Sequence, residues 1–289
     1  MVKETITWID PNGVEYVLTQ GERYDILNGV KGFYMPPIEV IEEEVPFQAG
    51  SRLRAVKVKS RDIDVPLKIS APDEVELLYA MRRLLQIFNP LKGNGKFRVS
   101  AVDGSQRELS CLYLGGLELE ESDQTKGKTW LKAISVFKAF DPYWYDSNSI
   151  VQTFKINEAP GTFFPIFPLR LSSSTVFADI SIDNSGDVET WPEWIITGPG
   201  ENIVLRNMST GDVMNLETSI GVGETIIIDT KPYAKTVTKN DGANLFYTLT
   251  DESSLWSIQE GENSIQLEMA NATTESSIQL TYRNRYWGP

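Results

Sequence analysis

The stretch FKAFDPYWYD, residues 137–146, places five aromatic rings in ten positions. It ends an alternating run, TWLKAISVFKAF, that is typical of a long strand, and Pro142 is expected to stop that strand. We interpret it as the seam between a first domain, residues 1–146, and a second, residues 147–289, in which residues 147–168 form a linker or crossover. A contact between copies of the chain is the alternative, since Tyr and Trp are favoured at interfaces.

Upstream of the seam, the sequence predicts strands and hairpins. TITWI and EYVLT flank the turn residues Asp10–Gly13, and KFRVSAV and ELSCLYL flank Asp103–Gly104. Residues 61–70, RDIDVPLKIS, alternate so that every second side chain is apolar, which is the period of a half-buried strand.

The first domain also contains a predicted helix, APDEVELLYAMRRLLQIFNP. Asp73 is a suitable N-cap, and Asn89-Pro90 ends the helix. One apolar stripe recurs at three- and four-residue spacing and is expected to pack onto the sheet. Its members are Val75, Leu78, Met81, Leu85 and Phe88.

Downstream of the seam, the sequence predicts short strands separated by turns and no helix. The expected strands are VFADISI, EWIIT, NIVLRN, ETIIID, LFYTL, SIQLEM and SIQLTYR. Strands at this spacing favour an antiparallel sandwich or jelly roll. YRNRYWGP, residues 282–289, either completes this sandwich or returns to the first domain.

Composition excludes several classes of chemistry. The chain of 289 residues has no histidine and one cysteine. Catalytic triads and most zinc sites need an imidazole, so we expect neither, and no disulfide forms within the chain. Residues 1–146 hold 19 basic and 22 acidic residues, and residues 147–289 hold 8 and 18. A net charge of -13 argues against tight binding of nucleic acid. No signal peptide or membrane-spanning helix is expected.

Paired carboxylates remain as a possible catalytic device, because glycoside hydrolysis uses two of them. The densest clusters are Glu42–Glu44 and the group Glu118, Glu120 and Glu121. Carboxylates on alternating strand positions are usually a solvated face, and we expect no catalytic residue here. Asp183–Asp187 could hold calcium but is more typical of a turn.

Two weaker motifs carry no predicted function. Gly221-Val222-Gly223 lacks the third glycine and the helix of a dinucleotide site. Asn271-Ala272-Thr273 is formally a glycosylation sequon, without a secretion signal beside it. We therefore expect no cofactor and no metal.

The basic run SRLRAVKVKSR, residues 51–61, has three interpretations. It could contact nucleic acid, or form the outward face of a strand or arm. It could also pair with the acidic EVIEEEV, residues 39–45, of a neighbouring copy in a ring.

Three tryptophans, Trp191, Trp194 and Trp256, lie in the second domain. Buried tryptophan fills a sandwich core, and exposed tryptophan can stack on a sugar ring. We favour the core for all three.

The sequence resembles the distal tail proteins of long-tailed phages. SVFKAFDPYWYD is similar to the end of their N-terminal domain, and IDNSGDVETWPEWIITGPG, NIVLRNMSTGDVMNL and GETIIIDT follow in the family's order. SLWSIQEGENSIQLEM carries a looser form of the family's turn. The resemblance implies a mainly β fold: a split-barrel-like N-terminal domain with one helix, and a galectin-like β-sandwich.

The resemblance also implies a role. Six copies would form a homohexameric ring at the distal end of the tail in the virion, joining the tail tube protein to the tail-tip protein. Receptor-binding protein and host polysaccharide are further partners that it allows, and DNA would pass through without tight binding. Such a hub is not an enzyme. A carbohydrate-binding module for adhesion to the host cell wall is the alternative, and a histidine-free glycosidase is the third hypothesis.

Overall fold

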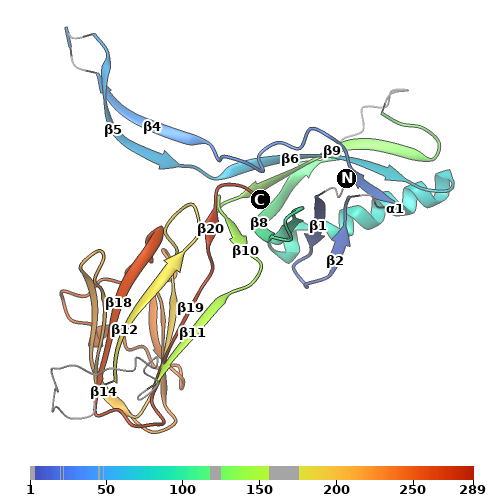
Figure 1. Cartoon of the computed structure of the whole chain (residues 1–289). Coiled ribbons are helices and arrows are strands. Elements are labelled where there is room, and N and C mark those ends of the chain that lie inside the picture. Colours follow the sequence, from blue (N-terminus) through green and yellow to red (C-terminus); the bar gives the residue numbers. More distant parts are fainter. Residues whose placement is uncertain are drawn as a thin grey trace. The chain divides into compact units, whose positions relative to one another are not determined.

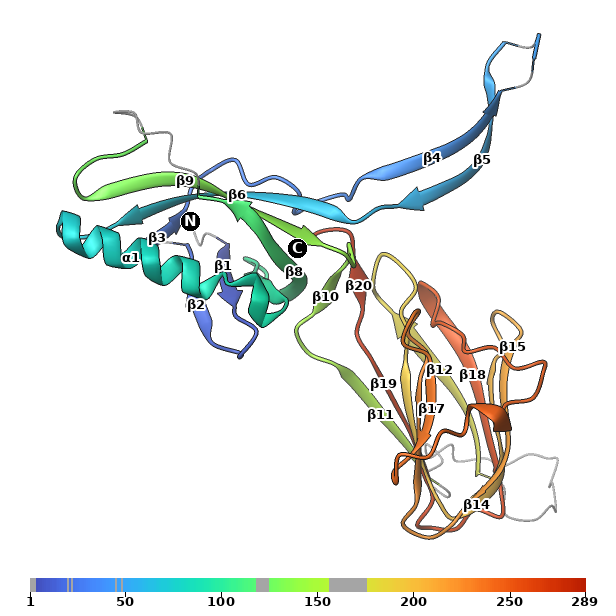
Figure 2. The same ribbon diagram turned by 180° about the vertical axis from the view of Figure 1, so that it is seen from behind.

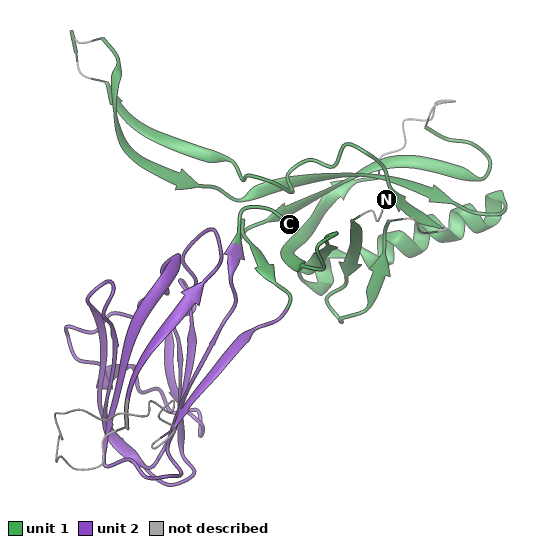
Figure 3. Cartoon of the chain, viewed as in Figure 1, with its two compact units in different colours: residues 1–147, 286–289 green, residues 148–285 purple. Residues whose placement is uncertain are grey.

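The computed structural model describes residues 4–19, 21, 23–44, 46–47, 49–117, 125–155 and 176–289. The chain separates into two compact units (Figure 3). Unit 1 comprises residues 1–147 and 286–289, and unit 2 comprises residues 148–285. Each unit has a hydrophobic core of its own.

Unit 1 is a mainly β structure built on a nearly closed, barrel-like sheet. Its strands follow the order β2-β1-β7-β8-β9-β6-β3, and β10 pairs with both β8 and β20 (Figure 1). The strands are β1 (Thr5–Ile9), β2 (Glu15–Val17), β3 (Tyr24–Ile26), β6 (Arg61–Ser70), β7 (Gly95–Ser100), β8 (Gln106–Gly116), β9 (Trp130–Ala139), β10 (Trp144–Asp146) and β20 (Arg285–Tyr286).

Both predicted hairpins of unit 1 are confirmed, because β1 pairs with β2 and β7 pairs with β8. The alternation predicted over residues 61–70 is confirmed as well. Ile63, Val65, Leu67 and Ile69 are fully buried, since every second side chain of β6 faces the core. β6 runs antiparallel to β9 along its whole length.

The helix α1 (Glu74–Ile87) covers one face of this sheet. Asp73 caps it as predicted, since its carboxylate accepts a 2.8 Å hydrogen bond from the Glu76 amide. A short 3-10 helix, η1 (Pro90–Lys92), follows and begins at the predicted Asn89-Pro90 stop.

The predicted packing stripe of α1 was right for Met81 and Phe88 and wrong for its other three residues. The residues that enter the core are Leu77, Ala80, Leu84, Ile87 and Phe88, with Met81 packed at its edge. Val75, Leu78 and Leu85, which the prediction placed in the core, are 59%, 46% and 51% exposed. Both sets recur with helical spacing, so periodicity alone does not say which one meets the sheet.

Residues 38–58 form a hairpin that we call the arm. Its strands β4 (Ile38–Glu44) and β5 (Ser51–Val58) pair only with each other among the described residues. Figures 1 and 2 show the arm extending away from the sheet of unit 1, continuous with the start of β6. Nearly every side chain of the arm is exposed on both of its faces.

Unit 2 is a sandwich of two antiparallel sheets around the second core, as predicted. One sheet has the order β11-β19-β13-β16-β17 and the other β12-β18-β14-β15. The strands are β11 (Ile150–Lys155), β12 (Val176–Asn184), β13 (Glu193–Thr197), β14 (Gly200–Asn207), β15 (Asp212–Ile220), β16 (Thr225–Asp229), β17 (Thr236–Lys239), β18 (Gly261–Ala270) and β19 (Ser277–Tyr282).

Two predictions in unit 2 need correction. LFYTL is not a strand: Phe246–Thr248 form a 3-10 turn, η2, because the Asn244 and Thr248 side chains bond to the local backbone. In the predicted linker, residues 147–168, residues 150–155 form β11, which pairs with β19 along six residues. Residues 156–168 lie outside the described residues. Strands β15 and β17 were not predicted.

Candidate assembly surfaces

The described residues contain no group of three or more Asp, Glu, Cys or His side chains that could hold a metal. Cys111 is fully buried, and this burial raises the pKa of its thiol well above the ordinary value. A thiol in that state is a poor nucleophile. No helix of the described part of the chain combines the length and hydropathy of a membrane span.

The predicted acidic clusters do not converge. Glu42–Glu44 lie on the exposed strand β4, where Glu43 forms an ion pair with Arg54 and Glu42 accepts a hydrogen bond from Ser51. Glu118, Glu120 and Glu121 lie outside the described residues. Asp183 and Asn184 end β12, and the chain bends at Gly186 and Asp187. The buried Asn184 side chain accepts a 3.0 Å hydrogen bond from the Gly186 amide.

The aromatic stretch 137–146 closes the core of unit 1. β9 ends at Ala139, and the chain turns at Asp141, whose carboxylate accepts a 2.7 Å hydrogen bond from the Tyr145 hydroxyl. Trp144 is fully buried and stacks edge-on against Phe33, with ring centroids 5.2 Å apart. Its indole Nε1 donates to the Phe33 oxygen at 2.8 Å.

The last residues of the chain pack against this same stretch within unit 1. Tyr286 donates a 3.2 Å hydrogen bond to Asp146, and the Arg107 guanidinium lies 3.5 Å above the Tyr286 ring. Trp287 contacts Tyr143, with ring centroids 5.2 Å apart. The polypeptide therefore leaves unit 1 and returns to it at the same place, beside β10.

Arg61 joins three segments of unit 1. It is fully buried at the start of β6, and its Nη1 donates to the carbonyls of Gly32, Phe33 and Tyr34 at 3.1, 2.9 and 2.5 Å. Nη2 donates to the Trp287 carbonyl at 2.9 Å. Burial lowers the pKa of Arg61 to about 10, which still leaves it charged at neutral pH. A charged donor bonded to several carbonyls holds the root of the arm and the chain end together.

The arm brings the basic run and the acidic run together within one chain. β5 pairs with β4, and Arg54 and Lys59 form ion pairs with Glu43 and Glu39. This confirms the interpretation of the basic run as the outward face of a strand or arm, and pairing with the acidic run of a neighbouring copy stays a prediction. The two runs are hairpin partners because the short link between them lets them meet locally, before any second copy is present.

In unit 2, two of the three tryptophans fill the core. Trp194 and Trp256 are 0% and 3% exposed, with ring centroids 5.5 Å apart, which confirms the core interpretation for this pair. Trp191 is partly exposed, and the Lys235 ammonium lies 5.7 Å from its ring.

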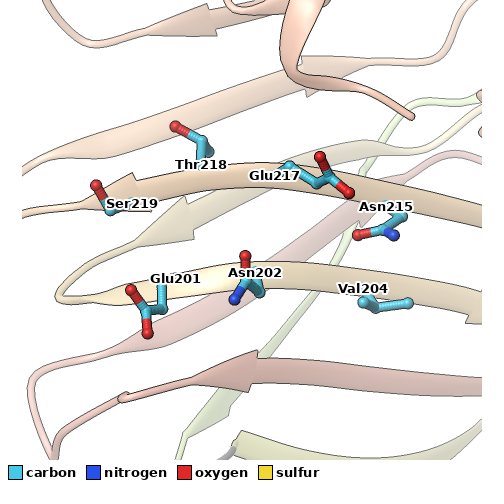
Figure 4. A pocket seen from close by; sticks show the side chains of 7 residues that line it. All are labelled: Glu201, Asn202, Val204, Asn215, Glu217, Thr218 and Ser219. Atoms are coloured by element: carbon cyan, nitrogen blue, oxygen red, sulfur yellow. The ribbon is translucent and has the colours of Figure 1, made fainter. Parts of the chain in front are cut away.

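A hollow of about 530 Å³ lies over β14 and β15 of unit 2 (Figure 4). Its lining is mostly polar and includes the carboxylates of Glu201 and Glu217. The other lining residues are Asn202, Val204, Asn215, Thr218 and Ser219. It has no aromatic side chain on which a sugar ring could stack.

Residues 185–286 match the family of siphovirus-type tail components, in its C-terminal domain. This match supports the resemblance to distal tail proteins of long-tailed phages over that part of the chain.

Relatives and solved structures agree with this family. The chain is 24% identical over 219 residues to the minor tail protein Gp27 of Mycobacterium phage D29, and 22% identical over 226 residues to that of phage L5. Each alignment covers 70% of this chain and 64% of the relative's length.

The fold is similar over the whole chain to that of the SPP1 Dit (gp 19.1) protein, described as a hub adsorption apparatus. The TM-score is 0.69 at 13% identity, covering 98% of this chain and 99% of that one. A chain of the phage P2 baseplate matches with a TM-score of 0.58 at 12% identity, over the full length of both chains. These likenesses confirm the predicted mainly β fold.

Proposed function

We propose that this protein is the hub of a phage tail: six copies form a ring that joins the tail tube to the tip and the host-binding proteins. The observation that carries the proposal is the likeness of fold over 98% of the chain to a protein described as a hub. Unit 1 forms the ring, and unit 2 faces outward. The chain spans about 64% of the length of its mycobacteriophage relatives, so the proposal does not rest on their assembly.

The outer face of the unit 1 sheet suits a conduit for DNA. Along β6 and β9 it carries carboxylates and ammonium groups side by side, as in the ion pair of Asp62 with Lys138 at 3.4 Å. Further along the same face, Asp64 lies opposite Val136, and Lys68 lies opposite Lys132. A surface of mixed charge does not release counterions on meeting DNA, so DNA would pass without tight binding.

The expected partners are the tail tube protein, a tail-tip protein and a receptor-binding protein. Unit 2, with 8 basic and 18 acidic residues in the second half of the chain, offers an acidic surface to them. The work of such a protein is geometric, so we propose that it is not an enzyme and needs no cofactor.

The carbohydrate-binding alternative finds little support among the described residues. Two of the three tryptophans that it needs at the surface are buried, and the hollow of unit 2 is without aromatic side chains. The carboxylate cluster of Glu42–Glu44, which the sequence offered as a candidate for glycoside hydrolysis, lies on an exposed arm.

The test is the oligomeric state and the location of the protein. We expect light scattering of the purified full chain to give a mass of six copies at high concentration, and negative-stain images to show rings. Antibodies against the protein should label the distal end of the tail. A chain that stays monomeric at every concentration, with no label on virions, would contradict the proposal.

A further inference from the structure

The arm of unit 1 presents an apolar stripe that no described element covers. Val40 and Val56 are paired across the hairpin, so they share a face. Ile38 lies two residues before Val40, and Leu53 pairs with the residue two after it, which places both on that face. These four side chains, the arm stripe, are 45% to 64% exposed: Ile38, Val40, Leu53 and Val56.

An isolated two-stranded hairpin is only marginally stable in water. The arm pairs with no third strand in the described chain and has apolar side chains in solvent. Its root is nevertheless fixed, because Arg61 holds the carbonyls of residues 32–34 and the Lys59 amide donates to Pro37 at 2.9 Å. A hairpin that is fixed at its base and exposes apolar side chains would be stabilised by another protein surface packing on it.

The outer face of α1 presents a second uncovered apolar stripe. Val75, Leu78, Tyr79 and Leu85, the helix stripe, are 46% to 59% exposed and lie opposite the buried Leu77, Ala80 and Leu84. A surface helix normally carries polar residues on that side. The apolar character of both faces of α1 indicates that its outer face is also buried in the assembly.

The two stripes match in length and in charge. α1 has 14 residues and so is about 21 Å long. β5 has 8 residues and so is about 26 Å long. Arg82, one helical turn from Leu78 and Leu85, lies within the helix stripe. Glu43 is paired with Arg54 inside the arm, and the exposed Glu42 and Glu44 lie beside the arm stripe towards the hairpin tip. Carboxylates on one surface and a guanidinium on the other are complementary.

We propose that the arm stripe of one copy packs along the helix stripe of the next copy. The inference rests on the proposed ring and names the contact that builds it. The arm and the free end of α1 lie at opposite ends of unit 1 in both views (Figures 1 and 2). A contact between two different surfaces at opposite ends is heterologous, and repetition of a heterologous contact closes a ring when the rotation per copy allows it.

Cysteine cross-linking tests this contact in the full-length chain. Cys111 is buried and serves as a silent background. We expect Val40→Cys and Leu78→Cys chains to form a disulfide-linked dimer only when mixed, and a chain carrying both to form a ladder of oligomers. Val40→Cys mixed with Val222→Cys is the control, because Val222 is 71% exposed in a turn of unit 2 and belongs to neither stripe.

Each result of the cross-linking experiment either supports or overturns the proposed contact. Dimers from either single variant alone would indicate a contact between identical surfaces and overturn the proposal. Wild-type rings without cross-links in the Val40→Cys and Leu78→Cys mixture would overturn the arm-to-helix contact and leave the ring standing. If the wild-type chain forms no ring, the proposed function and this contact both fail.

A second experiment introduces a negative charge into each stripe and measures the concentration at which the chains assemble. Val56→Asp and Leu78→Asp each place a carboxylate in the apolar contact, so each should raise the concentration at which half the chains assemble by about tenfold or more. Leu91→Asp, at a position 94% exposed outside both stripes, should leave that concentration unchanged. Because all three positions are exposed in the single chain, unfolding temperatures should agree, and equal assembly of all variants would refute the contact.

Discussion

The guanidinium of Arg61 donates a 2.9 Å hydrogen bond to the carbonyl of Trp287, 226 residues later in the chain. Through its other nitrogen it bonds the carbonyls of residues 32–34, at the root of the arm. One buried cation therefore ties together the start of β6, the arm and the returning chain end. Glycine is required at residue 32, since its φ is +83° and a Cβ would collide with the Asp62 carbonyl.

Replacing Arg61 should destabilise unit 1. Arg61→Met removes four hydrogen bonds from a charged donor and leaves buried carbonyls without their partner, so we expect a loss of about 3 kcal/mol or more in unfolding free energy. Arg61→Lys should recover only part of it, because an ammonium lacks the fork that reaches both segments.

Denaturant unfolding measures these losses, with Arg52→Met on the exposed arm as the control, expected within about 0.5 kcal/mol of wild type. Hydrogen exchange should report faster exchange near residues 31–34 and 286–288 in Arg61→Met. Unchanged exchange in both segments would show that Arg61 does not join them.

Neighbouring leucines of α1 should respond in opposite ways. Leu77→Asp puts a carboxylate into the core and should cost more than about 3 kcal/mol of stability, whereas Leu78→Asp should be close to neutral in the monomer. Circular dichroism at low concentration compares them directly. If Leu78→Asp unfolds the chain as readily as Leu77→Asp, the register of α1 on the sheet is not the one described.

Glu108 should make stability depend on pH. Burial acts to raise the pKa of its carboxyl, but hydrogen bonds from Arg98 at 2.8 and 3.0 Å and from Lys96 at 3.2 Å outweigh burial, so the pKa lies below its usual value. A lowered pKa stabilises the fold above the unfolded-state pKa of about 4.3, and this contribution disappears as pH falls through the folded-state pKa.

Glu108→Gln should therefore be less stable than wild type by about 1 kcal/mol at pH 7, with the difference shrinking as the pH falls below about 4. Glu15→Gln is the matched control, since Glu15 bonds the same Arg98 at 2.6 Å but is half exposed, and its effect should be smaller. If the stability difference between Glu108→Gln and wild type stays constant from pH 7 to pH 3, it does not arise from the lowered pKa of Glu108.

The buried amide of Asn263 should be essential to the turn before β18. Its Nδ2 donates to the carbonyls of Gln259 and Gly261 at 2.8 and 2.9 Å, and its Oδ1 accepts from the Gln259 amide at 2.9 Å. Asn263→Ala should cost about 2 kcal/mol of stability, because three backbone groups lose their hydrogen-bond partner. The exposed Asn244→Ala, which loses one hydrogen bond, should cost clearly less in the same urea titration.

Much of the fold follows from local patterns in the sequence. The alternation of β6, the Asp73 cap and the turns at Asp10–Gly13 and Asp103–Gly104 depend on neighbours in the chain, so they could be predicted. β11 could not, since its six residues become a strand by pairing with β19, more than a hundred residues away. LFYTL failed for the opposite reason, because local side-chain bonds outweighed its strand propensity.

The sequence by itself determined the β-rich class, the two halves of different charge and the resemblance to phage tail proteins, because composition, period and motif order are properties of the chain alone. Only the tertiary structure decided which apolar face of α1 is buried, that the acidic and basic runs form one arm, and that the chain end returns to Arg61. Those features depend on contacts between residues distant in sequence, whose energies no local pattern records.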